Sequence, residues 1–380
     1  MFSISRIHQV LQAIPRGAFE RLVQQHGADR YTKGFGCWQQ LVAMVYAQLS
    51  GAASLRQLEA AFNAHPAQHY HLHAARVHRS TLAEANARRD PQVFARLLEL
   101  LMQQGGRSVR RQREELRLLL DATTVALPYE CERVNARIRP SLKLHVLLDA
   151  DTAVLAHASL TSARVDDKTE ARKLALQVGA TYVFDRGYCD YNWWARIGQD
   201  GARFVTRFRR DAALRFLREV PVADGPVVRD SIVAFRIQKP RGGHLNSYST
   251  PLRRIEVRRP DAAVLVLATN DLDSNAEEIA QMYKQRWQIE LLFKWVKQHL
   301  QIRRFLGRNE NAARIQVLTA LIAYMLVLLL KVRTGFAGTL WMLLSQLRSS
   351  LFQRPQTEES YWRRRQALAA HIAAVQAQLL

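Results

Sequence analysis

Residues 283–297 carry the pattern of a helix that is buried along one side only, and this pattern constrains the fold around it. At 100° per residue, a polar stripe roughly 60° wide is formed by Tyr283, Arg286, Glu290 and Lys297. Apolar residues occupy another side of the same helix: Ile289, Leu292 and Val296. The helix can therefore pack on a core while a carboxylate, two cations and a phenol face a cleft. Such a stripe suits a site that holds a metal ion and a phosphate together.

The charge of the chain favours a polyanionic partner. Its 380 residues include 55 Lys and Arg against 33 Asp and Glu, which gives a formal charge of +22 and a pI near 10.6. Such a chain repels itself unless a polyanion binds it. A basic protein of the membrane surface is the alternative, but it would concentrate its charge on one amphipathic helix or tail. Arginine is spread over the whole length here, so we expect double-stranded DNA as the partner and no membrane.

Three further features bear on location and on bound groups. The first residues lack the apolar core of a signal peptide, so we expect them to belong to the fold of a cytoplasmic, nucleoid-associated protein. The apolar run from Val317 to Leu330 is shorter than the roughly 20 residues of a membrane span, which predicts a buried core helix. No CxxC spacing is present, so the cysteines are predicted to be buried thiols: Cys37, Cys131 and Cys189.

The first 103 residues show the patterns of a wholly helical domain. Helix starts are marked by Ser54 with Gln57, by Thr81 with Glu84, and by Asp90 before a proline. Four short helices are predicted at residues 37–49, 55–62, 82–88 and 92–102. A helix-turn-helix that recognises DNA ends has helices of this size, and so has a plain helical bundle. The sequence leaves both open.

Beyond a basic linker at residues 104–115, the patterns change to a mixed α/β fold. Strands are predicted at residues 117–127, 142–148, 154–160 and 181–184, with a helix at 168–178. More strand-like runs lie between residues 204 and 269, and Ser274 with Glu277 then caps the helix that carries the polar stripe. We therefore expect five regions: a helical N-terminal domain (1–103), the linker (104–115), a catalytic core (116–203 and 270–335), a β-rich insertion (204–269) and a helical C-terminal region (336–380).

Two carboxylates follow predicted buried strands, at the rim of the predicted sheet. Asp121 follows three leucines, and Asp185 follows an apolar run and precedes Arg186 and Gly187, where glycine permits a sharp turn. A carboxylate in such a place is costly to bury unpaired, and a divalent cation relieves that cost. Together with Glu290, these acids can converge on two Mg²⁺ ions about 3.5–4 Å apart, which is the arrangement used in phosphodiester chemistry.

This ordered set of residues resembles the DDE transposases of bacterial insertion sequences. The resemblance rests on Asp121 in Leu-Asp-Ala-Thr, on Asp185 in Phe-Asp-Arg-Gly-Tyr, and on the run Tyr-x2-Arg-x3-Glu-x6-Lys that ends at Lys297. That run is the signature of the insertion-sequence type four family, and it matches at every spacing. The resemblance covers roughly residues 115–335, and residues 79–86 also look like the leading domain of such transposases.

The resemblance implies a fold, a chemistry and a set of partners. The fold is a ribonuclease H-like core with a β-rich insertion, in which Asp121, Asp185 and Glu290 bind two Mg²⁺ ions, with Mn²⁺ as a substitute. The residues that contact DNA phosphates are Tyr283, Arg286, Lys297 and Arg186. The enzyme binds inverted-repeat ends and target DNA as a homodimer in a paired-end complex. Relatives form a hairpin with one flipped base, and the aromatic side chains that could stack on it are Trp193, Trp194 and Trp287.

Simpler interpretations exist for each motif. The stripe can be a solvated face on which Glu290 pairs with Lys294. The closely spaced histidines between residues 65 and 78 have no accompanying cysteine, so we expect a DNA-facing or partly buried loop and no metal there. A further set of arginines is expected to track DNA phosphates, with a solvated surface as the alternative: Arg207, Arg209, Arg210, Arg253, Arg254, Arg258 and Arg259.

For the whole chain, we expect a DDE transposase that cuts DNA and joins the freed 3′-OH to a target. One alternative is a metal-dependent nuclease of the same core without strand transfer. The other is a catalytically silent DNA-binding protein derived from a transposase.

Overall fold

The computed structural model describes residues 5–110, 115–127, 141–236, 245–260 and 263–354. They form two compact units, one made of residues 1–85 with 326–380 and the other of residues 86–325. Of the expected buried thiols, Cys37 and Cys189 are buried, and Cys131 lies outside the described residues.

Helices alone build the described part of the first unit. They are α1 (Arg6–Leu11), α2 (Arg16–Gln25), α3 (Cys37–Ser50), α4 (Leu55–Asn63), α5 (Pro66–His69), η1 (Tyr70–Leu72), most of α6 (Arg79–Arg88), the end of α12 (Glu310–Thr334) and α13 (Leu340–Ser350). The backbone N–H of Ile7 donates to the carbonyl of Leu351 at 2.9 Å, so distant stretches of the chain share this unit. Three leucines of α13 are buried in it: Leu343, Leu344 and Leu347.

Two of the expected helix starts are confirmed, and one is wrong. Ser54 Oγ accepts from the N–H of Gln57 at 3.1 Å, and Asp90 Oδ1 accepts from the N–H of Gln92 at 2.9 Å. Thr81 does not cap a helix, because α6 already begins at Arg79.

Helix α7 (Gln92–Arg110) continues into the segment expected to be a linker. Gly105 lies on the side of α7 that packs in the second unit, where an added Cβ would come within 3.0 Å of Val154 and 3.3 Å of Met325. The glycine therefore serves a close helix contact and does not end the helix.

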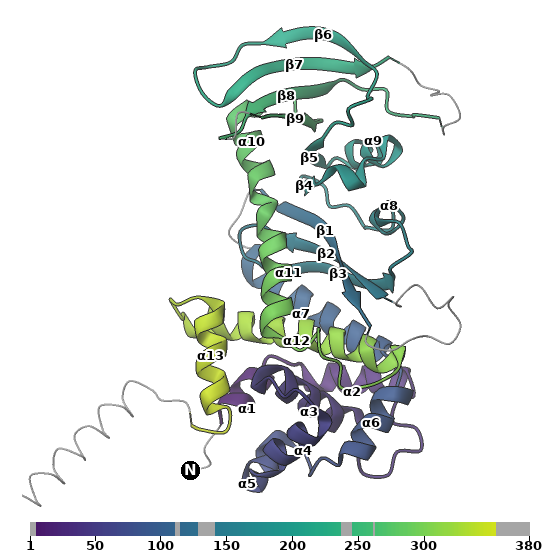
Figure 1. The fold of residues 1–380 in the computed structure, drawn as a ribbon, viewed down its shortest axis with the longest axis vertical. Coiled ribbons are helices and arrows are strands. Elements are labelled where there is room, and N and C mark those ends of the chain that lie inside the picture. Colours follow the sequence, from purple (N-terminus) through teal and green to yellow (C-terminus); the bar gives the residue numbers. More distant parts are fainter. Residues whose placement is uncertain (1–4, 111–114, 128–140, 237–244, 261–262, 355–380) are drawn as a thin grey trace, which may run out of the picture. The chain divides into compact units, whose positions relative to one another are not determined.

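The second unit is organised around one mixed sheet of nine strands. The strands are β1 (Arg117–Ala126), β2 (Ser141–Asp149), β3 (Leu155–Ser162), β4 (Thr181–Phe184), β5 (Arg203–Arg207), β6 (Leu214–Val220), β7 (Val227–Phe235), β8 (Leu252–Arg258) and β9 (Val264–Thr269). Their order is β3-β2-β1-β4-β5-β9-β8-β7-β6 (Figure 1). The strands β1, β2 and β3 form an antiparallel meander, while β4 and β5 run parallel to β1.

The mixed α/β class is thus confirmed, with two differences in detail. The helix expected at 168–178 is only α8 (Asp167–Ala171). The strand-like runs after residue 204 extend the same sheet, because β9 pairs antiparallel with β5.

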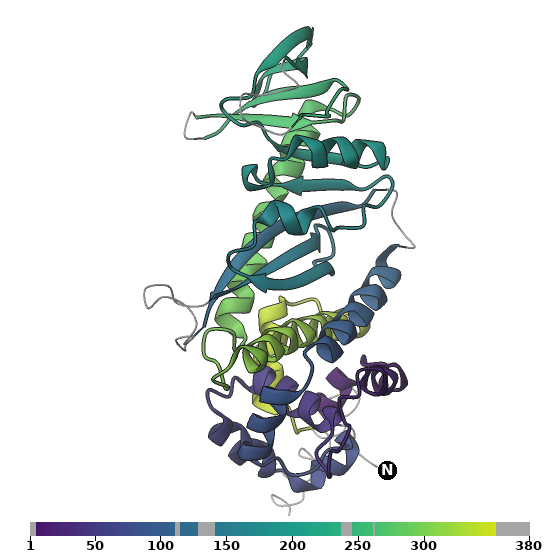
Figure 2. The ribbon, with the colours of Figure 1, turned by 90° about the vertical axis from the view of Figure 1, so that its right-hand side faces the viewer.

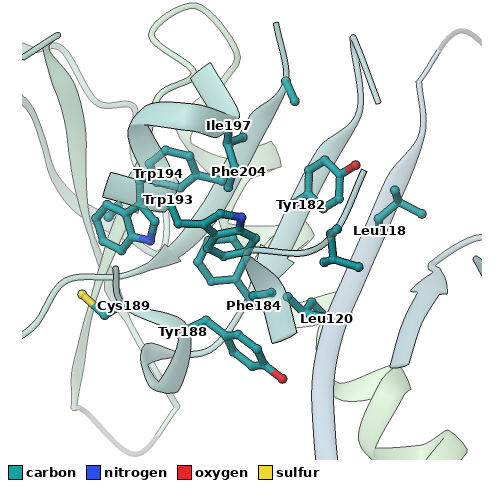
Figure 3. Close-up of a cluster of buried hydrophobic side chains, with 14 of the residues drawn as sticks. Leu118, Leu120, Tyr182, Phe184, Tyr188, Cys189, Trp193, Trp194, Ile197 and Phe204 are labelled. Carbon is teal, nitrogen blue, oxygen red and sulfur yellow. The ribbon is translucent and has the colours of Figure 1, made fainter. Parts of the chain in front are cut away.

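An aromatic core covers one face of this sheet. Trp193 and Trp194 of α9 (Tyr191–Gln199) lie against rings from β4 and β5, with ring centroids 4.8 Å from Phe184 and 5.0 Å from Phe204, respectively (Figure 3). Leu118 and Leu120 of β1 belong to the same cluster. Because side chains alternate along a strand, the intervening residues of β1 project from the opposite face.

That opposite face is covered by two consecutive helices, α10 (Ala276–Gln285) and α11 (Trp287–His299), which follow the sheet in both views (Figures 1 and 2). The polar stripe of residues 283–297 predicts one continuous helix, but in the structure the helix is broken at Arg286. The N–H of Arg286 bonds to Tyr283 and its carbonyl accepts from Ile289, so the bonds span three residues at the break. The side chain that caps α10 is Asn275 and not Ser274, whose hydroxyl donates to Asp271.

Helix α12 is longer than expected and is apolar enough to cross a membrane by length and composition. Its most apolar window of 18 residues is 83% buried inside the protein. It is therefore a core helix, as predicted from its apolar run.

A buried ion pair joins β7, β8 and the loop before α10. Arg253 donates from Nε to Asp230 Oδ1 at 3.0 Å and from Nη2 to Oδ2 at 2.6 Å, and its Nη1 donates to the carbonyl of Ser274. The two side chains are 5% and 0% exposed. The expectation that Arg253 tracks DNA phosphates is therefore wrong, because its donors are engaged inside the protein.

Replacing Arg253 by leucine should lower the free energy of unfolding by about 3–5 kcal/mol, because the Asp230 carboxylate stays buried without its partner. Urea denaturation followed by circular dichroism measures the change. The exposed Arg258 on the same strand provides the control, since Arg258→Leu should change stability by less than about 0.5 kcal/mol. Equal losses in both variants would contradict the structural role of the pair.

Candidate active site

Strand pairing brings the two predicted aspartates together. In the parallel ladder of β1 and β4, Leu120 pairs with Phe184, and each is followed directly by an aspartate, Asp121 or Asp185. Leu120 and Phe184 both face the aromatic core, so both aspartates follow on the other face of the sheet. Asp121 does not stand at a strand end as expected, because β1 continues to Ala126 in its pairing with β2.

The turn after β4 is shaped by Asp185 itself. Its Oδ1 accepts from the N–H of Gly187 at 2.8 Å, and its carbonyl accepts from the hydroxyl of Thr206. A Cβ at Gly187 would come within 2.8 Å of the same carboxylate oxygen, so a side chain there would displace the Asp185 carboxylate. Arg186 is exposed between them.

Helix α11 brings the third acid to the same face, together with a cation. Arg286 donates from Nη2 to Glu290 Oε1 at 2.5 Å, and its Nη1 lies 3.5 Å from Asp121 Oδ2. The interpretation in which Glu290 pairs with Lys294 on a solvated face is therefore wrong. One guanidinium joins two of the three predicted catalytic carboxylates.

The remaining residues of the polar stripe also reach this face. Lys297 donates from Nζ to Thr123 Oγ1 at 2.5 Å, and Arg286 lies 5.9 Å from the ring centroid of Tyr283. Thr123 was not singled out in the sequence. The signal was available, because Thr123 stands two residues after Asp121 and must share its face of a strand.

The pKa of the Asp121 carboxyl shows how closely the acids interact. Burial is the main cause that raises this pKa to about 6, and the charges of Asp185 and Glu290 raise it further. A bond from the N–H of Ala122 and the charge of Arg286 act in the opposite direction. Burial also raises the pKa of Tyr283, on which Asp185 acts in the same sense. Asp185 and Glu290 are therefore both within electrostatic reach of Asp121.

These residues fit divalent metal ions by their chemistry. Three carboxylates provide the oxygen donors that Mg²⁺ prefers, and a cation among them would relieve the repulsion that raises the pKa of Asp121. Within the described ranges, no three His, Cys, Asp or Glu side chains are already gathered at metal-binding distances. The arrangement provides the donor residues, but their side chains are not yet closed around one point.

Two cavities lined by arginine lie beside the Asp185 turn. One has a volume of about 500 Å³ and the other about 360 Å³, and both are lined by Arg186, Arg209 and Arg210. Arg207 and Arg254 line the second cavity, together with apolar residues of β6 and β9. Of the arginines expected to bind DNA, these five therefore line cavities, in contrast to the buried Arg253.

The three candidate tryptophans differ in exposure. Trp193 and Trp194 are 2% and 0% exposed and belong to the aromatic core, so they are not available to stack on a base (Figure 3). Trp287 is 58% exposed and directly follows Arg286. Of the three, only Trp287 can meet a nucleobase without unfolding the core.

The histidine-rich segment has ordinary packing roles. His69 is buried, hydrogen-bonds the carbonyl of Phe62 through Nε2 at 3.0 Å, and stacks on the Phe62 ring. His65 stacks on Phe352. The segment is thus partly buried, which is one of the two environments predicted for it.

The raised pKa of Asp121 predicts a pH dependence of stability. Between about pH 4 and pH 6 the unfolded carboxyl ionises while the folded one keeps its proton, so stability falls as pH rises through this window. Asp121→Asn should remove this loss and make the protein up to about 3 kcal/mol more stable than wild type at pH 7.5. Urea denaturation at pH 4 and pH 7.5 measures the free energy of unfolding of both proteins. If Asp121→Asn changes this free energy by the same amount at both pH values, the raised pKa of Asp121 is contradicted.

Comparisons with known proteins identify the family of the chain. The family described as Transposase DDE domain matches residues 112–326, and a domain of unknown function, DUF4372, matches residues 3–74. The y4zB protein of Sinorhizobium fredii (strain NBRC 101917 / NGR234), which carries a transposase name, is 43% identical over 253 residues, covering 65% of this chain and 69% of that protein. A Geobacillus stearothermophilus protein named as a transposase for insertion sequence element IS5377 is 28% identical over 267 residues, with 66% and 67% covered.

Among solved structures, a piggyBac transposase synaptic complex with hairpin DNA aligns with a TM-score of 0.48 and 10% identity, covering 94% of this chain and 81% of that one. The family match spans more than half of the chain, and it contains all three carboxylates and the whole polar stripe. The chain therefore belongs to the transposase DDE domain family.

Proposed function

We propose that this protein binds the terminal inverted repeats of an insertion sequence and catalyses metal-dependent DNA cleavage and strand transfer. The proposal is supported by the strand pairing that puts Asp121 and Asp185 on one face of the sheet, and by the charges of Asp185 and Glu290, which both act on the carboxyl of Asp121. Membership in the transposase family supports the same reaction class.

The proposed catalytic core is ribonuclease H-like and comprises residues 116–203 and 270–335. An antiparallel meander, β1 to β3, followed by the parallel strands β4 and β5, supports this assignment. Residues 204–269 form the proposed β-rich insertion, which extends the core sheet through β9. We assign recognition of the DNA ends to residues 1–103, and residues 104–115, which α7 enters as far as Arg110, lead into the core. In the C-terminal region, residues 336–380, we assign α13 to core packing, in which Leu343, Leu344 and Leu347 take part.

In this mechanism, Asp121, Asp185 and Glu290 hold two Mg²⁺ ions, for which Mn²⁺ can substitute. When bound, the ions supply activation of water and stabilisation of the leaving oxygen. Water attacks the phosphorus at the transposon end, and the P–O3′ bond breaks. The freed 3′-OH then attacks a phosphorus of target DNA and forms a new P–O bond there, while the target's own P–O3′ bond breaks and leaves a 3′-OH. The carboxylates hold their positions through the strand pairing of β1 with β4 and through the packing of α11.

The cations of the stripe bind phosphates near the scissile bond. Burial, with the charge of Arg303, lowers the pKa of Lys297, so a phosphate would stabilise its charged form. Arg186 extends the positive surface toward the arginine-lined cavities beside the Asp185 turn, and Arg286 offers a planar fork that matches phosphate oxygens. The phenol of Tyr283 stands beside Arg286.

Catalysis then takes place in a homodimer that pairs two DNA ends, in the cytoplasm and on the nucleoid. The formal charge of +22 supports DNA as the partner. Lys and Arg side chains that neutralise DNA phosphates release counterions from the DNA, which favours binding.

Cleavage of a labelled duplex that carries the inverted repeats flanking the gene tests the proposal. Nicking at the repeat boundary should require Mg²⁺, stop with EDTA, and fall about a thousandfold or more in Asp185→Asn. Asp200→Asn is the matched control, because Asp200 is a half-exposed carboxylate paired with Arg196 at the end of α9.

The products distinguish the alternatives. Nicked ends that never join target DNA would identify a nuclease without strand transfer. Tight binding to the repeats with no cutting by wild type, under conditions that allow end pairing, would identify a silent DNA-binding protein.

Trp287 is the side chain that we expect to stack on a flipped base. Trp287→Ala should weaken binding of the repeat end by about 1–3 kcal/mol, measured by fluorescence anisotropy. Its exposed neighbour on α11, Leu291, supplies the control variant Leu291→Ala. If stacking is the cause, an abasic nucleotide at the flipped position should produce the same loss, and the two losses should not add. If the losses of binding free energy from Trp287→Ala and from the abasic nucleotide add fully at every position near the end, Trp287 does not stack on a flipped base.

A further inference from the structure

Arg286 occupies an unusual position for a residue expected to bind DNA. It stands at the break between α10 and α11, and its guanidinium contacts Glu290 at 2.5 Å and approaches Asp121 to 3.5 Å. Its side chain is only 19% exposed. In the protein alone, a fixed internal cation thus stands between two of the three carboxylates to which we assign metal binding.

We propose that Arg286 is a positioning residue that blocks metal loading until DNA arrives: it pairs with Asp121 and Glu290 in the free protein and moves to a DNA phosphate when the end is bound. This inference rests on the proposed function and assigns Arg286 two alternative partners. It explains how the site can stay inactive away from its substrate.

The first argument is competition between cations. A guanidinium and a divalent ion both compensate carboxylate charge, and both need the same oxygen atoms. While Arg286 engages Glu290 Oε1, that oxygen is not free for a metal ion, and the positive charge also repels one. A metal ion can use both acids only after the guanidinium has moved.

The second argument concerns the side chain's freedom to move. Among the residues that the structure describes, the Arg286 side chain interacts with residues of the site itself: Glu290, Asp121 and Tyr283. Arg253 provides the contrast, because its fork is locked by a fully buried aspartate and a backbone carbonyl. Arg286 can therefore exchange partners without breaking the fold.

The third argument is linkage. A phosphate is a bidentate partner for arginine of the same geometry as a carboxylate. If DNA removes Arg286 from the acids, DNA binding must strengthen metal binding, and metal binding must strengthen DNA binding by the same factor. The coupling is measurable as an affinity, independently of catalysis.

Isothermal titration of the full chain with Mn²⁺, without DNA, tests the competition. Arg286→Gln should bind Mn²⁺ about tenfold or more tightly than wild type. Arg286→Lys keeps the charge but cannot span both acids, and should fall between the two. The control is Arg314→Gln, which removes an arginine from a pair of the same i,i+4 spacing, with Glu310, and should leave the Mn²⁺ affinity unchanged.

The coupling is tested by repeating the titration with a saturating duplex that carries the repeat end. DNA should tighten Mn²⁺ binding by wild type about tenfold and have little effect on Arg286→Gln. Equal or weaker Mn²⁺ binding by Arg286→Gln in the free protein would overturn the proposal, as would a wild-type affinity that DNA does not change. Thermal melting of each variant verifies that it is folded.

One further variant separates this inference from the proposed function. Asp121→Asn with Glu290→Gln should abolish the Mn²⁺ site. If that double variant binds Mn²⁺ as wild type does, with and without DNA, the carboxylates are not the metal ligands, and the proposed function fails together with the inference. If it loses the site while Arg286→Gln matches wild type, only the role of Arg286 fails.

Discussion

The parallel pairing of β1 with β4 is the constraint on which the candidate site depends. It places Leu120 beside Phe184, so the residue that follows each of them is an aspartate on the same face of the sheet. The aromatic core on the other face holds both strands, since Phe184 packs on Trp193 and both belong to one buried cluster. Charge is thus concentrated on one face because the apolar residues occupy the other.

That concentration has an electrostatic cost, which the rest of the site reduces. Burial and neighbouring carboxylates raise the pKa of Asp121, and the guanidinium of Arg286 partly compensates. The break between α10 and α11 puts Arg286 within reach of Asp121, and α11 then presents Glu290 one turn later. Because the carboxylates repel one another, the site favours binding of cations. In the protein without a metal ion, Arg286 is the cation that pairs with Asp121 and Glu290.

Arginines of the same type have different roles according to where the sheet places them. Arg253 is buried against Asp230 and joins the strands to the loop before α10, whereas Arg186, Arg209 and Arg210 line cavities beside the Asp185 turn. The strands between residues 204 and 269 were expected as an insertion beside the site. They are continuous with the core sheet through β9, and Arg209 and Arg210 lie in the connection between β5 and β6.

The sequence by itself determined the local elements and the chemical identity of the site. Cap residues, apolar periods and the order of acids predicted most helices and the first strands, because these depend on neighbours a few residues apart. The family resemblance rested on the same local spacings. The sequence did not reveal the helix break at Arg286, the role of Thr123 as partner of Lys297, or which tryptophan is exposed.

Only the tertiary structure decided those points, because each depends on residues far apart in the chain. Lys297 meets Thr123 across 174 positions, and Arg253 meets Asp230 across 23. The sequence does not show whether an arginine on a strand contacts a buried carboxylate or solvent. A helical wheel also assumes a straight helix, so it does not show the break at Arg286. Strand pairing and burial supply the missing information, since they fix which side chains share a face and which of them can still reach DNA.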